Sequence, residues 1–248
     1  MQPRLALEPS CGKLFRAETL ASTITSTDVA MHFPEAVVHM QVGLPGSFNV
    51  MNVLEAAAVG RAMGIAPEAI CRSLSAVSSV EGRMERVWGS PVIGTAFVDY
   101  AHTPDALFQA LVTLGGLKPP GARILVVFGC GGDRDRAKRP EMGKIASKNA
   151  DFVIITSDNP RNEDPELILD EIEQGMSGGN YIRIRDRAEA IQRAVDLLES
   201  GDVLLVAGKG HEKYQEIRGR KEFFSDQEYL KIYMQEKFSA SPTVEGER

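Results

Sequence analysis

The chain is poor in cysteine and in long hydrophobic runs, and each of these two shortages excludes a class of protein. Its three cysteines, Cys11, Cys71 and Cys130, lie far apart and form no C-x-x-C pair, which argues against a disulfide framework or a thiolate zinc site. No hydrophobic run approaches the roughly 20 residues that a helix needs to cross a bilayer. Residues 1–8 contain no hydrophobic segment of a signal peptide. We therefore expect a soluble, cytoplasmic protein.

Positive charge is not in excess either. The chain has 34 Asp and Glu against 28 Lys and Arg, which gives a net charge of -6, so we expect no general binding to nucleic acid or to anionic membranes. The composition, 43% hydrophobic and 25% charged, is that of a globular protein with one large or two small domains.

Two regions of different pattern follow one another along the chain. In the first, the predicted elements are strands of an antiparallel region at 23–27 and 36–42 and helices at 48–64 and 67–77. Glycines at positions 82 and 89 mark residues 78–90 as the boundary. We expect one domain over residues 1–85 and a second over residues 86–248.

After this boundary, short apolar strands alternate with helices. Strands are predicted at 92–100, 123–128, 152–156, 181–184 and 203–207, and helices at 103–114, 140–149, 164–176, 188–198 and 226–237. This alternation predicts an α/β fold with a mostly parallel sheet and helices on both of its faces.

Four segments that follow the predicted strands are rich in glycine, charge and histidine. They are residues 99–102, 129–134, 157–161 and 208–212. Because ligands of open parallel sheets bind beyond the carboxyl ends of the strands, these segments predict one functional edge, although turns alone would supply some of the glycine.

Segment 129–134, Gly-Cys-Gly-Gly-Asp-Arg, precedes a predicted helix, so its backbone amides could hold an anion. It is not a dinucleotide G-x-G-x-x-G motif, because Arg134 takes the place of the last glycine. Four clustered cations favour a phosphate or carboxylate ligand: Arg134, Arg136, Lys138 and Arg139. The alternative is a glycine turn before a solvated, basic helix start.

Segment Asp158-Asn159-Pro160-Arg161 is a turn stiffened by proline, and its arginine can bind a carboxylate through two parallel hydrogen bonds. An Asx turn explains the same segment equally well. Segment 208–212 resembles a phosphate loop only superficially, because G-x-x-x-x-G-K-[ST] occurs nowhere in the chain. Its glycines still permit close approach of a ligand, whereas a plain solvent loop is the alternative.

Two further residue pairs suggest binding or catalysis. Asp99 and His102 could form an acid–base or nucleotide-facing pair, although a histidine that satisfies local backbone groups is the simpler interpretation. Asn49 and Asn52 lie three residues apart on one predicted helix face, so both amides could meet one ligand; N-capping would explain Asn49 equally well. No His, Asp or Glu cluster has metal-site spacing.

Taken together and in this order, these segments resemble the Mur ligase family. The similar blocks are Leu44–Asn52, Glu81–Glu85, Val98–Leu107, Phe128–Asp135, Lys138–Gly143, Asp158–Arg161 and Gly208–Glu212. Within the family, they resemble the ligases that add meso-diaminopimelate to UDP-N-acetylmuramoyl-L-alanyl-D-glutamate. The resemblance runs from about residue 20 to about residue 230.

The resemblance implies a peptide-bond-forming ligase of peptidoglycan precursor synthesis. In that family, ATP phosphorylates the substrate's glutamate carboxylate, Mg²⁺ neutralises the phosphates, and an amine attacks the acyl phosphate in a cleft that excludes water. Residues 86–248 would be the Rossmann-like C-terminal domain that binds the amino acid, and residues 1–85 the later part of the central domain.

The family's site residues carry over position by position. Those expected to bind meso-diaminopimelate are Arg134, Asp158, Asn159, Pro160, Arg161, Gly208 and Glu212. Those expected at the nucleotide cleft are Asn49, Asn52, Arg83, Asp99 and His102. Arg161 would bind the far carboxylate, which lysine lacks, and Glu212 the distal ammonium. No catalytic or metal-binding residue is assigned.

The sequence departs from the family pattern in one respect. It lacks the first domain, the ATP phosphate loop and the modified lysine that helps hold magnesium. We expect the chain to be a fragment or a split product that supplies the diaminopimelate-binding half and is inactive alone. UDP-N-acetylmuramoyl-dipeptide would be the second substrate, and a separately encoded N-terminal half a candidate partner.

Two other interpretations stay open. One is a non-catalytic module that retains diaminopimelate or a muropeptide as a signal. The other is a related folate- or cyanophycin-type ligase domain, which residues 158–161 and 208–212 together disfavour.

Overall fold

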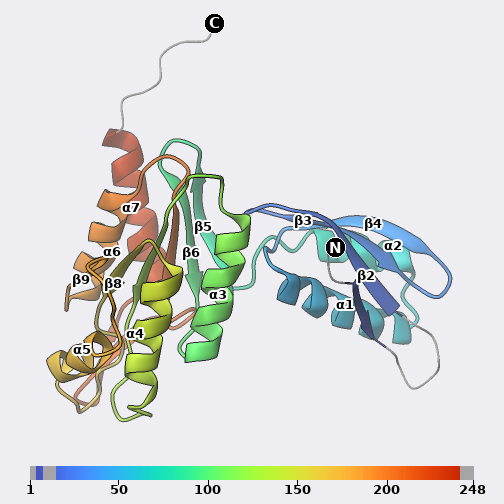
Figure 1. Cartoon of the computed structure of the whole chain (residues 1–248). Helices are drawn as coiled ribbons and strands as arrows, with labels where there is room; N and C mark the ends of the chain where they lie inside the picture. Colours follow the sequence, from blue (N-terminus) through green and yellow to red (C-terminus); the bar gives the residue numbers. More distant parts are fainter. Residues whose placement is uncertain (1–3, 8–14, 241–248) are drawn as a thin grey trace, which may run out of the picture. The chain divides into compact units, whose positions relative to one another are not determined.

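The computed structural model describes residues 4–7 and 15–240 and divides the chain into two compact units, Met1–Val80 and Glu81–Arg248 (Figure 1). Cys11 lies outside the described residues. The division falls within residues 78–90, but the end of that stretch forms strand β5 (Glu85–Ser90), which the sequence analysis did not predict.

The first unit consists of an antiparallel sheet followed by two helices. Its elements are β1 (Arg4–Leu7), β2 (Phe15–Ser22), β3 (Thr27–His32), β4 (Val37–Val42), α1 (Ser47–Ala62) and α2 (Pro67–Ser75). The strands pair in chain order, so the predicted antiparallel region and both helices are confirmed. The strand predicted at 23–27 is wrong, because Thr23 Oγ1 accepts the backbone amides of Thr25 and Ser26 and closes the turn between β2 and β3.

The second unit is an α/β fold around a six-stranded sheet of order β5-β6-β10-β7-β8-β9. Its further elements are β6 (Gly94–Asp99), α3 (Pro104–Leu117), β7 (Ile124–Phe128), α4 (Lys138–Asn149), β8 (Phe152–Ile155), α5 (Pro165–Glu173), β9 (Tyr181–Arg183), α6 (Arg187–Leu197), β10 (Val203–Ala207), β11 (Tyr214–Ile217), β12 (Arg220–Phe223) and α7 (Asp226–Ala240). All neighbouring strands are parallel except β5, which is antiparallel to β6. The predicted mostly parallel, Rossmann-like sheet is confirmed.

Helices cover both faces of this sheet (Figure 1). Helices α6 and α7 pack on the face that carries Val98, Val127 and Val206, and the alternate residues point to the opposite face, where α3 contacts β7 and β10. Strands β7 and β10 are buried along their whole length, because a parallel sheet covered on both sides has no solvent face.

The hairpin of β11 and β12 was not predicted. Its strands, Tyr-Gln-Glu-Ile and Arg-Lys-Glu-Phe, are exposed or only half-buried, so they lack the apolar alternation that identifies a strand in sequence. The hairpin nevertheless reaches the functional edge, since Ile217 forms a bridge with Arg161.

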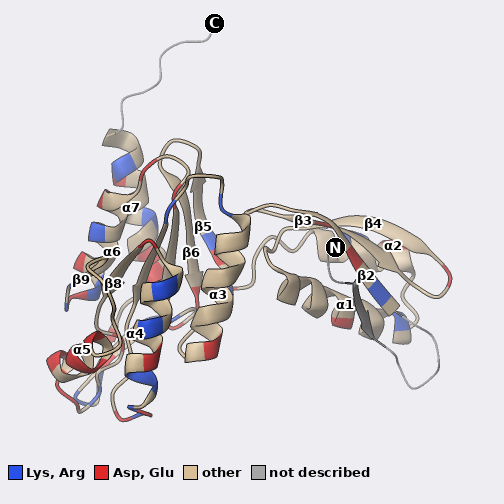
Figure 2. Ribbon diagram, viewed as in Figure 1, with Lys and Arg blue, Asp and Glu red and all other residues tan. Residues whose placement is uncertain are grey.

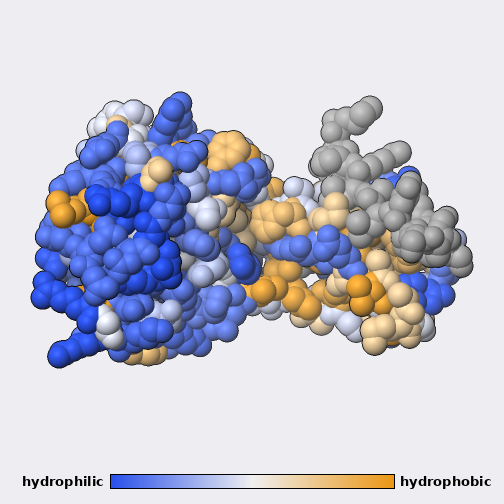
Figure 3. All heavy atoms as spheres, turned by 90° about the horizontal axis from the view of Figure 1, so that it is seen from below, coloured by the Kyte–Doolittle hydropathy of each residue, from blue (hydrophilic) through white to orange (hydrophobic). Residues whose placement is uncertain are grey.

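The four predicted segments follow β6, β7, β8 and β10, which are parallel, and they therefore meet at one edge of the sheet. Figure 3 shows the second unit from this side as mostly hydrophilic. Among the residues that the structure describes, no helix is long and apolar enough to cross a membrane.

Candidate functional site

A cavity of about 610 Å³ opens at the carboxyl edge of the sheet. It is lined by six of the seven residues predicted to bind diaminopimelate: Arg134, Asp158, Asn159, Arg161, Gly208 and Glu212. Tyr214, from the unpredicted hairpin, adds an aromatic wall. Residues that are far apart in the chain thus converge on one space.

Asn159 is the centre of the hydrogen-bond network beneath this cavity. The residue is only 3% exposed. Its Nδ2 donates to Glu212 Oε2 at 2.9 Å, and its Oδ1 accepts from Lys209 Nζ at 2.9 Å and from the Glu216 amide at 3.0 Å. The alternative Asx turn is not formed, because the Arg161 amide donates to the Glu216 carbonyl instead.

Lys209 lies completely buried below the same residues. Its Nζ is 3.8 Å from Asp158 Oδ1 and 3.8 Å from Glu212 Oε2. Burial lowers the pKa of Lys209, and the Asp158 carboxylate partly opposes that effect. The sequence analysis did not single out Lys209, because a lysine between two glycines is typical of an exposed loop.

Arg161 occupies the left-handed region of backbone conformation, with φ of 50°. Its Nη1 donates to the Gly132 carbonyl at 2.8 Å, and its Nε lies 3.4 Å from Glu216 Oε2. The side chain is 18% exposed. The guanidinium is therefore held at two points while it lines the cavity.

The glycine loop packs directly against the backbone of residues 156–160. A Cβ on Gly129 would lie 2.2 Å from the Thr156 carbonyl oxygen, and one on Gly132 would lie 1.9 Å from that of Pro160. The Gly132 amide donates to the Asn159 carbonyl at 2.9 Å. The glycines thus serve close packing, and this amide is not available to the anion that the sequence suggested.

The predicted cluster of four cations is divided by the structure. Arg139 is fully buried, and its guanidinium donates to Glu163 and Glu171, with N–O distances of 2.8 Å to each. Arg136 also pairs with Glu171. Figure 2 shows basic residues along α4 and acidic residues on α5. The solvated helix start is therefore wrong for Arg139, whose hydrogen bonds lower the pKa of Glu163 to about 2.

The other two cations of that cluster, Arg134 and Lys138, line the cavity. Arg134 is exposed, and its Nη1 donates to the Asp133 carbonyl at 3.0 Å. Lys138 Nζ donates to the His102 carbonyl at 2.8 Å. Two of the four predicted cations therefore border the cavity.

Asp99 and His102 have separate partners and do not form a hydrogen-bonded pair. The Asp99 carboxylate accepts the amides of Met84 at 2.6 Å and Ala101 at 2.8 Å, while burial raises its pKa. His102 Nδ1 lies 2.8 Å from the Tyr100 carbonyl oxygen, as the simpler interpretation expected.

The Tyr100 ring brings two of the predicted nucleotide-cleft residues together. Arg83 places its guanidinium carbon 5.1 Å from the ring centroid, and His102 meets the ring edge-on at 4.5 Å. His211 packs against the same ring at 5.3 Å. Arg83 and His102 thus share one aromatic neighbour.

In the first unit, Asn49 and Asn52 contact each other on α1. Asn52 Nδ2 lies 3.4 Å from Asn49 Oδ1, and Asn49 Nδ2 donates to the Pro45 carbonyl at 2.8 Å. The N-cap of α1 is Gly46, so N-capping does not explain Asn49.

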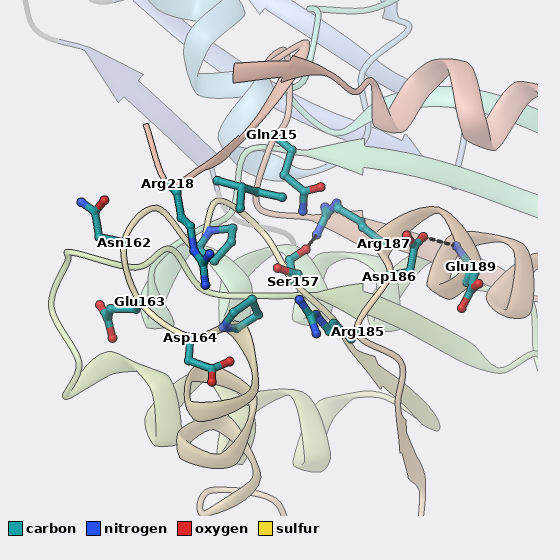
Figure 4. Close-up of a pocket in the computed structure, with 13 residues that line it drawn as sticks. Ser157, Asn162, Glu163, Asp164, Arg185, Asp186, Arg187, Glu189, Gln215 and Arg218 are labelled. Atoms are coloured by element: carbon teal, nitrogen blue, oxygen red, sulfur yellow. Dashed lines mark hydrogen bonds between the residues drawn. The ribbon is translucent and has the colours of Figure 1, made fainter. Parts of the chain in front are cut away.

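A larger cavity, of about 990 Å³, is bordered by the same 157–165 loop and contains Pro160, the seventh predicted residue (Figure 4). Several of its charged groups are engaged within the unit. Arg187 forms a fully buried ion pair with Asp226 at 2.7 Å, and Asp164 and Asp186 cap α5 and α6. We therefore place the candidate site in the smaller cavity, where the predicted residues converge.

Comparison with known proteins gives consistent relatives. A family model described as Mur ligase, glutamate ligase domain, matches residues 82–210. The chain is 56% identical over 228 residues to the UDP-N-acetylmuramoyl-L-alanyl-D-glutamate--2,6-diaminopimelate ligase of Chlorobium phaeobacteroides, which covers 92% of this chain and 44% of the relative. It is 44% identical over 212 residues to the enzyme of the same name from Halalkalibacterium halodurans, with coverage of 86% and 43%. The chain thus spans less than half the length of these relatives.

Solved structures of related ligases are also similar to this chain. One of an enzyme with the same name has a TM-score of 0.67 and 36% identity, and the match covers 90% of this chain and 45% of that one. A UDP-N-acetylmuramate-alanine ligase from Thermotoga maritima, at 18% identity and a TM-score of 0.63 over 91% of this chain and 46% of its own, shares the fold.

Proposed function

The chain belongs to the Mur ligase family, and we propose that it supplies the amino-acid-binding half of a ligase that adds meso-diaminopimelate to UDP-N-acetylmuramoyl-L-alanyl-D-glutamate. Residues 86–248 would be the C-terminal domain of that ligase and residues 1–85 a part of its central domain. The observation that carries the proposal is the convergence of the six predicted residues on the 610 Å³ cavity.

The charges of this cavity suit the far end of diaminopimelate, which bears both a carboxylate and an ammonium. Arg161 offers a planar guanidinium to the carboxylate. Glu212 and Asp158 offer carboxylates to the ammonium. Gly208 permits the close approach of the Asp158 carboxylate, because a Cβ there would lie 2.7 Å from Asp158 Oδ2. Arg134 at the rim adds a second cation for a carboxylate.

This chain would bind and orient the amine that attacks the acyl phosphate. ATP and Mg²⁺ form that acyl phosphate in the family, but the described residues contain no group of three or more His, Cys, Asp or Glu side chains able to hold a metal ion, and the sequence contains no Walker motif. We propose that the reaction takes place in the cytoplasm, because its proposed substrate is a nucleotide-linked precursor.

For the second unit, we propose that Arg83, Asp99 and His102 bind the nucleotide. For the first unit, considered by itself, we propose the same role for Asn49 and Asn52. The support is the packing of Arg83 and His102 on Tyr100 and the mutual contact of the two asparagines. Pro160 would act by restricting the turn that presents Arg161.

A ligation assay tests the proposal that this chain supplies only the amino-acid-binding half of the ligase. The reaction contains UDP-N-acetylmuramoyl-dipeptide, meso-diaminopimelate, ATP and Mg²⁺, with this chain alone or together with the region of the Chlorobium phaeobacteroides ligase that precedes its match. We expect tripeptide only when both parts are present. Tripeptide from this chain alone would contradict the proposal that a second part is needed. Failure of this chain to bind diaminopimelate would contradict the binding role.

A further inference from the structure

The amino group of Lys209 has no access to solvent. Its side chain is completely buried, and the three side chains that hydrogen-bond or pair with its Nζ, those of Asp158, Asn159 and Glu212, all line the candidate site. Nζ donates to Asn159 Oδ1 at 2.9 Å, and the carboxylates of Asp158 and Glu212 each lie 3.8 Å away. A buried lysine needs such partners, because an unpaired charge in the interior is strongly unfavourable.

We propose that Lys209 is a positioning residue that holds the Glu212 carboxylate, through Asn159, in the place where it meets the distal ammonium of the ligand. The inference rests on the proposed function and deepens it. With no exposed surface, Lys209 cannot itself contact a ligand in the cavity, so any effect on binding must pass through its neighbours.

The first part of the argument is the direction of the hydrogen bonds. An ammonium only donates, so Asn159 must turn Oδ1 toward Lys209, and its Nδ2 then points at Glu212 Oε2 at 2.9 Å. The Glu216 amide donates to the same Oδ1 and favours the same orientation. The amide of Asn159 thus transmits the position of Lys209 to the Glu212 carboxylate.

The second part is charge. Asp158 and Glu212 bring two negative charges to one side of the cavity, and Lys209 offsets one of them, so a single negative charge remains for one ammonium. The other charged groups that influence Lys209 are Arg187 and Asp226, which neutralise each other in an ion pair. Without Lys209, repulsion between the two carboxylates would turn one of them away from its present position.

The test compares two ligands that differ only at the distal amino group. 2-Aminopimelate keeps both carboxylates of diaminopimelate but has hydrogen in place of that group. Calorimetry on the chain and its Lys209→Met variant should show diaminopimelate binding weakened by roughly 10- to 100-fold, and 2-aminopimelate binding by less than about threefold. Equal losses for the two ligands would overturn the inference, because they would mean that Lys209 merely supports the loop.

Two variants sharpen the comparison. Arg161→Ala, the matched control, should weaken both ligands alike, since both keep the far carboxylate. Asn159→Asp keeps the acceptor for Lys209 but replaces the donor to Glu212 by a carboxylate that repels Glu212 from its position. It should therefore reproduce the selective loss, which also covers the case in which Lys209→Met does not fold. Equal losses in Asn159→Asp would again overturn the inference. Failure of the unaltered chain to bind diaminopimelate would overturn the proposed function, and this inference with it.

Discussion

Removal of the Glu163 carboxylate should destabilise the second unit at neutral pH but not at strongly acidic pH. Glu163 accepts hydrogen bonds from the buried Arg139, and these lower its pKa from 4.5 to about 2. A lowered carboxyl pKa stabilises the folded state above the unfolded pKa, and that contribution disappears as the pH falls from about 4.5 toward 2. The shift corresponds to at most about 3 kcal/mol, or about 2 kcal/mol after allowance for the partial exposure of Glu163.

Because the chain has a single tryptophan, the free energy of unfolding of the second unit can be measured by itself. Trp88 lies in β5 and packs against the core of the second unit, so its fluorescence follows the unfolding of that unit in urea. Glu163→Gln should lower the free energy of unfolding by about 2 kcal/mol at pH 7, and the difference should vanish near pH 2. Glu236→Gln, at an exposed position of α7, is the matched control.

A difference between Glu163→Gln and the unaltered chain that stays constant from pH 7 to pH 2 would refute this reasoning. It would mean that the side chain stabilises the fold by packing alone. A pH dependence of the same size in the Glu236→Gln control would refute it as well.

Two further predictions concern buried groups. Gly132→Ala should destabilise the second unit by about 1–3 kcal/mol or more, because the added Cβ meets a backbone oxygen. Gly116→Ala on α3, where nothing lies within 4 Å of the added Cβ, should stabilise the unit by about 0.5 kcal/mol. Urea unfolding followed by Trp88 fluorescence measures both changes, and equal effects of the two substitutions would contradict the close packing of the glycine loop. In a Cys11→Ser variant, Cys71 and Cys130 should react slowly with a thiol reagent at pH 8 until the chain unfolds, since burial raises their pKa to about 11 and about 12; rapid reaction of the folded chain would contradict this.

The sequence predicted most of the sheet because its strands are buried. Strands β7 and β10 lie between helical layers, and their unbroken apolar runs are visible without any structure. The hairpin of β11 and β12 carries polar residues on an exposed surface and gives no such signal. The threonines at 23–27 have high strand propensity, but side-chain hydrogen bonds to nearby amides favour a turn there.

The candidate site was predictable in part for a similar reason. Segments after parallel strands must meet at one edge, so the convergence of Asp158 and Glu212 follows from topology. The ion-pair partners of Arg139 and Lys209 depend on the burial of these residues, which cannot be predicted from residue type alone. Arg139 was expected among the cations that favour an anionic ligand, or in a solvated helix start, and Lys209 was not singled out. Both residues are fully buried in ion-pair networks.

The most direct test of the central claim is calorimetry of meso-diaminopimelate and L-lysine on this chain and on its Arg161→Ala variant. Charge-assisted hydrogen bonds contribute about 1.5–3 kcal/mol, so the variant should bind diaminopimelate roughly tenfold to a few hundredfold more weakly. Lysine, which lacks the far carboxylate, should bind the unaltered chain more weakly and change little in the variant. Equal losses for the two amino acids would contradict the account, because Arg161 would then shape the loop without binding the carboxylate.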